Sequence, residues 1–249
     1  LLFKKYAKTV DYPLGLQIVT DEEASGLLGT GHQIGCGIKT DFVLAGESTN
    51  MKINNEAKGV LWVKFDIKGK TYHSSQPWNG DNAISKASKI LEKLNEEFGN
   101  VKSNKWVTTC NVATITTSNK TVNKVPDNCT FVVDIRFIPE DRQRVKKVIK
   151  TLEGSDVMVQ VIEEGSPCFT DNRNKDIKQL LKEMRAFGIN NKFIKKHGSS
   201  DIRFYNEAGM PGITFGPVGD NIHADNEWVS LKSLKQYYLI MGRFILNLK

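Results

Sequence analysis

The stretch between residues 60 and 163 constrains the fold most strongly, because its apolar pattern alternates between strand and helix periods. Strands have a period of two residues and amphipathic helices a period of 3.6. The pattern predicts strands over 60–72, 106–117, 129–138 and 156–163, and helices over 82–98 and 140–153. This β-α-β-β-α-β order is typical of a ferredoxin-like domain. We therefore expect an antiparallel sheet with both helices on one face and the other face free for solvent or a partner.

The flanking segments have a different character. Residues 15–20 predict a buried strand and residues 42–45 a second, and both are followed by acidic and small residues. After residue 166 we expect helices over 174–187 and from near Ser200, strands over 192–196 and 212–215, and a last helix with Ser230 as its N-cap. The predicted fold class is therefore α/β. A mixed-sheet catalytic domain, formed by residues 1–58 and 166–249, is interrupted by the ferredoxin-like domain at 59–165.

Length and charge narrow the function classes. The 249 residues exceed one ordinary domain of about 100–150 residues. The net charge is +7, but no basic run is longer than a pair, and we interpret the lysine pairs 146–147 and 195–196 as solvated helix faces. We therefore expect no nucleic-acid partner. The apolar runs are shorter than the roughly 18 residues of a membrane span, and the four cysteines show no Cys-x-x-Cys spacing. We expect no membrane association and a reducing cytoplasm.

Carboxylates and a histidine follow the predicted strands of the interrupted domain. Glu22 and Glu23 end the first strand, Glu47 follows the second, and His223 follows a glycine-rich turn. Adjacent carboxylates point in different directions, so one can bind a metal while the other moves protons. Carboxylate and imidazole donors suit Zn²⁺, and carboxylates also tolerate Mn²⁺ or Co²⁺. Taken singly, a solvated acidic turn and an ordinary loop histidine are the commoner explanations.

The inserted domain has its own candidates. His73 lies at the end of its first strand, and Asn123 precedes a Val-Pro segment. Arg136 lies inside an apolar strand, two residues after Asp134. Such an arginine forms either a structural salt bridge with Asp134 or a fork that holds a substrate carboxylate. The residues alone favour the salt bridge and leave both possibilities open.

Several motifs occur in order along the whole chain. They are Thr20-Asp21-Glu22-Glu23, residues 41–47, Gly69-x-x-x-His73 with Pro77, Asn82-Ala83, Asn123-x-Val-Pro126, Asp134-Ile-Arg136, Ser200-Asp201, Phe215-Gly-Pro217 and His223-x-x-Asn-Glu227. This ordered set resembles the zinc amidohydrolase and peptidase family. That family includes aminoacylase, acetylornithine deacetylase, succinyl-diaminopimelate desuccinylase, carboxypeptidase G and the aminotri- and dipeptidases.

The resemblance implies a role for each acidic motif. Glu22 would be the general base and acid, Glu23 a ligand of one zinc, Glu47 a ligand of the other, and His223 a further ligand. The resemblance thus implies two Zn²⁺ per complete active site, with Co²⁺ or Mn²⁺ as possible replacements. The reaction it implies is hydrolysis of an amide bond in an N-acyl amino acid or short peptide.

The resemblance also assigns the inserted domain as a lid that joins two copies in a homodimer. His73 would reach the active site of a partner subunit and stabilise the oxyanion. Asn123 and Arg136 would hold the substrate's carboxylate. Ser199 and Ser200 would line the substrate pocket.

The chain also departs from the family pattern. Neither the family's His-x-Asp strand nor its bridging aspartate is found, and the chain opens at Leu1. On that pattern we expect about a hundred further residues before Leu1 and an inactive isolated chain. The loop that would line the substrate pocket, residues 196–201, differs from the corresponding loop of the desuccinylases. This difference argues against succinyl-diaminopimelate as the substrate. The alternative function is a catalytically incomplete member that acts as a binding or dimerisation module.

Overall fold

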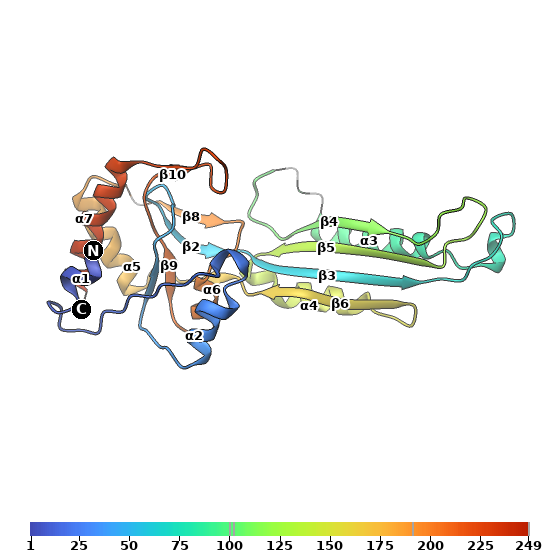
Figure 1. The fold of residues 1–249 in the computed structure, drawn as a ribbon, viewed down its shortest axis with the longest axis horizontal. Helices are drawn as coiled ribbons and strands as arrows, with labels where there is room; N and C mark the ends of the chain where they lie inside the picture. Colours follow the sequence, from blue (N-terminus) through green and yellow to red (C-terminus); the bar gives the residue numbers. More distant parts are fainter. Residues whose placement is uncertain (100, 102, 191, 249) are drawn as a thin grey trace. The chain divides into compact units, whose positions relative to one another are not determined.

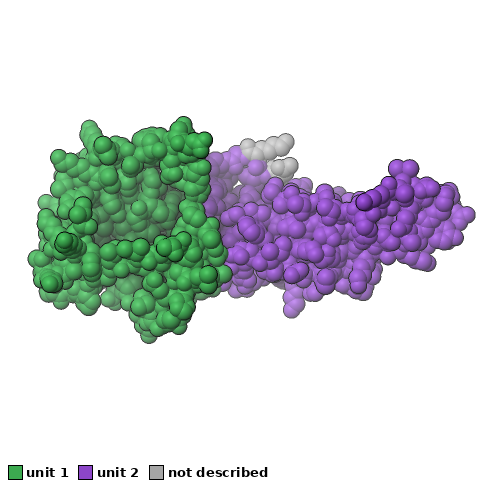
Figure 2. All heavy atoms as spheres, in the orientation of Figure 1, with its two compact units in different colours: residues 1–57, 168–196, 200–249 green, residues 58–167, 197–199 purple. Residues whose placement is uncertain are grey.

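The computed structural model describes residues 1–99, 101, 103–190 and 192–248. These residues form two compact units (Figure 2). Unit 1 contains residues 1–57, 168–196 and 200–249, and unit 2 contains residues 58–167 and 197–199. Across the described ranges, no helix is both long and apolar enough to span a membrane.

Unit 2 is built on a four-stranded antiparallel sheet with the strand order β4-β5-β3-β6. Its elements, in chain order, are β3 (Gly59–Lys68), α3 (Ala83–Phe98), β4 (Thr109–Thr116), β5 (Asn128–Phe137), α4 (Arg142–Thr151) and β6 (Val157–Gly165). Short 3₁₀ helices span Pro77–Asn79 and Pro139–Asp141. Both α-helices lie against one face of the sheet (Figure 1). The predicted β-α-β-β-α-β order is confirmed.

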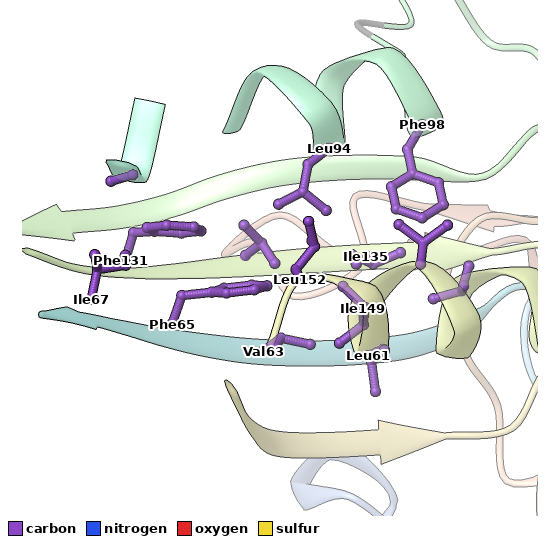
Figure 3. Close-up of a cluster of buried hydrophobic side chains, with 14 of the residues drawn as sticks. Leu61, Val63, Phe65, Ile67, Leu94, Phe98, Phe131, Ile135, Ile149 and Leu152 are labelled. Atoms are coloured by element: carbon purple, nitrogen blue, oxygen red, sulfur yellow. The ribbon is translucent and has the colours of Figure 1, made fainter. Parts of the chain in front are cut away.

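The core of unit 2 follows from the period of its strands and helices. Every second residue of β5 from Cys129 to Phe137 is buried. The rings of Phe65 and Phe131 stack with centroids 4.7 Å apart, and Leu94 of α3 points toward them (Figure 3). Helix α3 begins at Asn82, whose side-chain carbonyl accepts hydrogen bonds from the backbone N–H groups of the first turn. Local sequence signals thus place each element of this unit.

Unit 1 contains a mixed sheet with the strand order β1-β9-β2-β7, in which β8 pairs with β2. The strands are β1 (Val43–Ala45), β2 (Ile53–Ala57), β7 (Cys168–Phe169), β8 (Phe193–Lys196) and β9 (Gly212–Thr214). The chain also forms α1 (Leu2–Tyr6), α2 (His32–Gly35), α5 (Lys175–Ala186), α6 (Ile202–Glu207) and α7 (Leu231–Asn247). A two-stranded ribbon, β10 (Gly219–Asp220) with β11 (Trp228–Val229), is antiparallel.

Helices cover both faces of the sheet in unit 1. Leu44 packs in the cluster that includes α5 and α7, whereas its neighbours Val43 and Ala45 pack with Ile202 of α6. Successive strand residues point to opposite faces, so α6 lies opposite α5 and α7. The last helix begins after Ser230, whose hydroxyl accepts from the N–H of Ser233, as predicted.

The predicted strand at 15–20 is wrong. The segment has no regular structure, and the side chains of Leu16 and Ile18 are 60% and 77% exposed. A strand needs a neighbour to bond its backbone N–H and C=O groups. Among the described residues no strand pairs with this segment, so its apolar residues alone do not make it a strand.

Strand β2 was not predicted, although it lies in the middle of the sheet. Its sequence, Ile-Asn-Asn-Glu-Ala, lacks both the alternation and the apolar run that mark a strand. Asn54 and Asn55 are nevertheless buried. The Asn55 side chain donates to the carbonyl oxygen of Thr170 at 2.9 Å, which compensates for its loss of water.

The core of unit 2 yields a matched mutational test. Ile135 on β5 is fully buried, and Ile115 on the neighbouring β4 is 53% exposed. Because it leaves a cavity, Ile135→Ala should lower the free energy of unfolding by about 2–5 kcal/mol. Ile115→Ala should change it by only about 0.5 kcal/mol. Urea unfolding followed by tryptophan fluorescence measures both, and equal effects would contradict this core.

Thiol reactivity tests the burial of the cysteines, all four of which are unpaired. Cys36 is exposed, whereas burial raises the pKa of Cys110 to about 11 and that of Cys168 to about 12. Only the thiolate reacts, so at pH 8 one fast thiol is expected, with the others reacting on unfolding. Ellman's reagent measures this, and Cys36→Ser should remove the fast phase. Two or more fast thiols in the folded protein would contradict the structure.

Candidate active site

The Glu22-Glu23 pair begins a short 3₁₀ helix, Glu22–Ala24, in the loop that leads to α2. Asp21, just before it, accepts hydrogen bonds from the N–H groups of Leu28 at 2.8 Å and Gly29 at 2.9 Å. The Asp21 carboxylate therefore closes the loop on itself and fixes where the two glutamates leave it.

Residues at the start of α6 form hydrogen bonds with the same loop, residues 25–30. The Thr30 hydroxyl donates to Asp201 at 2.6 Å, and the Arg203 guanidinium donates to the carbonyl oxygen of Ser25. Gly26 has a φ of +68°, and a Cβ there would lie 2.1 Å from the Asp201 carboxylate. Glycine is required at this position by both conformation and space.

Glu47 follows β1 by two residues. Its carboxylate accepts a hydrogen bond from the Lys196 ammonium at 2.7 Å and another from the Ser200 hydroxyl at 3.0 Å. A Cβ at Gly216, just after β9, would lie 2.0 Å from the Glu47 carbonyl oxygen. The close approach of these two segments places the Glu47 loop beside the turn that follows β9.

His223 lies between β10 and β11. Its Nε2 is 2.9 Å from the Glu23 carboxylate, 200 residues away in the sequence. This hydrogen bond raises the pKa of His223 above the usual value of a histidine. Both side chains are well exposed, at 66% and 74%, so solvent reaches the pair. A carboxylate and an imidazole at this separation can share a proton or face a common cation.

Backbone strain gathers in the loops that carry these residues. Among the described non-glycine residues, positive φ angles occur at Ser25, Asn50, Met51, Asn221 and His223. Each lies within four residues of Glu23, Glu47 or His223, or is His223 itself. Side-chain-bearing residues rarely adopt this region, and such strain clusters at functional sites.

Glu22 is the carboxylate with acid–base character. Its partial burial raises its pKa above the usual range, and the nearby carboxylates of Glu47, Glu23 and Asp201 raise it further. The Lys196 ammonium opposes this shift and lowers the pKa. A carboxyl group whose pKa is moved toward neutrality can both accept and return a proton.

The predicted metal ligands are only partly brought together. Glu23 and His223 form a pair of zinc-type donors. Glu47 instead directs its carboxylate to Lys196 and Ser200. Among the described residues no group of three or more histidine, cysteine, aspartate or glutamate side chains could hold a metal ion. The donor types fit zinc at the Glu23–His223 pair, and the number of donors falls short of a complete shell.

In unit 2, the predicted residues occupy two places. The His73 imidazole lies 2.7 Å from the Ser75 hydroxyl. The backbone N–H of Ser74, between them, donates to the carbonyl oxygen of Asn123. His73 and Asn123 therefore lie on adjoining loops. Arg136 on β5 donates two hydrogen bonds to Asp134, at 2.8 and 3.0 Å. Of the two possibilities for Arg136, the structure contains the salt bridge.

Residues 197–199, including Ser199, group with unit 2, whereas Ser200 groups with unit 1. The His197 imidazole meets the Trp106 ring edge-on at 5.7 Å, and the Lys58 ammonium lies 5.9 Å from the centre of that ring. Lys58 is only 1% exposed. The sequence analysis predicted a site role for neither Lys58 nor Trp106. The position of Lys58, between Ala57 at the end of β2 and Gly59 at the start of β3, was a possible signal.

The interpretation of the lysine pair 195–196 as a solvated helix face is wrong about the element, although Lys195 is exposed. Both residues end strand β8 and both form ion pairs, Lys195 with Glu56 at 2.8 Å and Lys196 with Glu47 at 2.7 Å. Sequence composition could not reveal this, because the acidic partners come from segments about 140 residues earlier in the chain.

Comparisons with known proteins agree with this architecture. Residues 55–154 match the family model described as the peptidase dimerisation domain. A succinyl-diaminopimelate desuccinylase of Rickettsia bellii is 26% identical over 252 residues, which cover 92% of this chain and 63% of that protein. An uncharacterized metallohydrolase of Methanocaldococcus jannaschii is 24% identical, with 90% and 62% covered. The chain thus spans less than two thirds of the length of these relatives.

Two solved structures share the fold. A tripeptidase of Staphylococcus aureus superposes with a TM-score of 0.74 at 24% identity, covering 90% of this chain and 61% of that one. An aminopeptidase PepT of Bacillus cereus has a TM-score of 0.76 at 20% identity, with 92% and 64% covered. Residues 55–154 thus match a peptidase dimerisation domain, and the chain shares the fold of these two peptidase structures.

Proposed function

We propose that the protein is a zinc-dependent hydrolase that cleaves an amide bond in an N-acyl amino acid or short peptide. The observation that carries the proposal is the Glu22 carboxylate, whose pKa is raised, next to the Glu23–His223 pair. Desuccinylases and tripeptidases, the activities named for two of the similar proteins, share amide hydrolysis as their chemical step.

Glu23 and His223 would hold the zinc. When bound, the ion polarises the amide carbonyl and lowers the pKa of water. Glu22 accepts a proton from the attacking water, since its raised pKa favours proton uptake. Glu22 then returns that proton to the leaving amine. Asp21, Asp201 and Arg203 hold the loop on which Glu22 and Glu23 are placed.

The lid residues recognise the substrate in this proposal. Arg136 keeps guanidinium N–H groups beyond the two that bind Asp134, and these can hold a substrate carboxylate together with Asn123. His73 stabilises the oxyanion in the active site of a partner subunit, which requires a homodimer formed through the lid. Ser199 and Ser200 line the pocket.

One observation favours a second function, a binding or dimerisation module without catalysis. No group of three metal-binding side chains occurs in the described part of the chain, while residues 55–154 match a dimerisation domain. The two functions differ in a simple measurement. A full-length protein that dimerises and shows no hydrolysis with any N-acyl amino acid or short peptide in the presence of zinc would favour the module.

Removal of the proposed proton carrier tests the mechanism. In the full-length protein, Glu22→Gln should lower kcat about 10²- to 10⁴-fold, because glutamine cannot accept and return the proton. Zinc content and thermal stability should stay close to those of the wild type. Glu92→Gln, at an exposed position of α3, is the matched control and should leave kcat unchanged. Wild-type kcat in Glu22→Gln would remove Glu22 from this role.

Zinc affinity tests the ligand pair independently of catalysis. Glu23→Gln and His223→Gln each remove one donor, so each should weaken zinc binding by at least about tenfold. Calorimetric titration of the metal-free protein gives the affinity. Asp225→Asn, at an exposed position of the same loop as His223, is the control and should bind zinc like the wild type. Unchanged affinity in both ligand variants would exclude the pair as the zinc site.

A further inference from the structure

Lys196 forms an ion pair with Glu47, the carboxylate that the family resemblance assigns as a metal ligand. Its ammonium lies 2.7 Å from one oxygen of Glu47, while the Ser200 hydroxyl lies 3.0 Å from the other. Both carboxylate oxygens of Glu47 therefore have partners within the chain. Glu47 does not form a metal-binding group with two other acidic, histidine or cysteine side chains of the described residues.

This ion pair is placed by the fold. Lys196 is the last residue of β8, which pairs in parallel with the central strand β2, and Ala57 is its register partner. Glu47 is held at its backbone by the close approach of Gly216. The side chains of Lys196 and Glu47 are 25% and 36% exposed, so water screens the pair only in part. Neither partner is a freely moving surface group.

A cation at this position has an electrostatic reason. The carboxylate of Glu47 interacts electrostatically with those of Glu22 and Asp201 and raises the pKa of both. Without a positive charge among them, these carboxylates would repel one another in a partly buried site. A bound divalent ion would supply that charge, and the Lys196 ammonium supplies it from within the chain. An ammonium and a metal ion repel each other strongly at such short range, so one excludes the other.

We propose that Lys196 acts as a built-in cation that replaces the metal ion at Glu47, so that this chain binds zinc at the Glu23–His223 pair alone. The proposal deepens the proposed function and rests on it for the identity of the first zinc site. It assigns Glu47 to charge balance and loop positioning in place of metal coordination. Lys196 becomes the residue that sets the metal stoichiometry.

The test is a zinc titration of the metal-free 249-residue chain by calorimetry, with stoichiometry checked by elemental analysis. Lys196→Met removes the charge and keeps much of the side-chain volume, so Glu47 becomes available to zinc. We expect this variant to bind one more zinc per chain than the wild type, with an affinity at that site increased about tenfold or more. Lys196→Arg retains the cation and should keep the wild-type stoichiometry.

Two further variants make the result specific. Lys195→Met removes the neighbouring lysine of β8, which pairs with Glu56, and should leave zinc binding unchanged. Lys196→Met combined with Glu47→Gln should lose the additional zinc again. Circular dichroism and a thermal melt confirm that each variant is folded, and a zinc-induced rise in Tm specific to Lys196→Met provides a second readout.

Equal zinc stoichiometry and affinity in the wild type and Lys196→Met, including no binding in either, would overturn the proposal. An additional zinc that persists in the double variant would also overturn it, because Glu47 would then not be the ligand. The titration measures no hydrolysis. An inactive full-length protein whose zinc stoichiometry still changes in Lys196→Met would contradict the proposed function alone. An active protein whose zinc stoichiometry does not change in Lys196→Met would contradict this inference alone.

Discussion

The parallel pairing of β1 with β9 is the contact on which the site depends. It joins Val43 to Gly212 and Ala45 to Thr214, residues about 170 positions apart with all of unit 2 between them. The backbones meet closely, since a Cβ at Gly212 would lie 2.3 Å from the Val43 side chain. This pairing brings the Glu47 loop against the turn at Gly216, and that turn leads to His223. Without it, the candidate site residues of unit 1 would lie on unconnected loops.

Charge balance is the second constraint on the site. Glu22, Glu23, Glu47 and Asp201 place several carboxylates in neighbouring loops, and their mutual repulsion opposes folding. Lys196 and the hydroxyls of Ser200 and Thr30 compensate for Glu47 and Asp201. The Glu23–His223 pair remains exposed to solvent. The distribution of internal cations thus separates two kinds of carboxylate, one balanced by the chain and one facing solvent with an imidazole.

Unit 2 has a different physical basis. Its hydrophobic core comes from β3, β5, α3 and α4, and the rings of Phe65 and Phe131 stack within it. The helices cover one face of the sheet, so the other face carries the polar residues of the strands, Arg136 and Asp134 among them. The apolar face determines the fold, and the polar face is available for recognition.

The sequence by itself determined the elements whose signals are local. The helices capped at Asn82 and Ser230 and the alternating strands of unit 2 follow from side-chain periods and capping within a few residues. The candidate site residues could also be named from the order of their motifs. The tertiary structure decided what depends on distant partners. It left residues 15–20 without a strand, made the polar segment Ile53–Ala57 a central strand, joined Glu23 to His223, and gave Lys196 to Glu47. Pairing across a sheet and between loops is set by segments 100 to 200 residues away, and no local pattern contains that information.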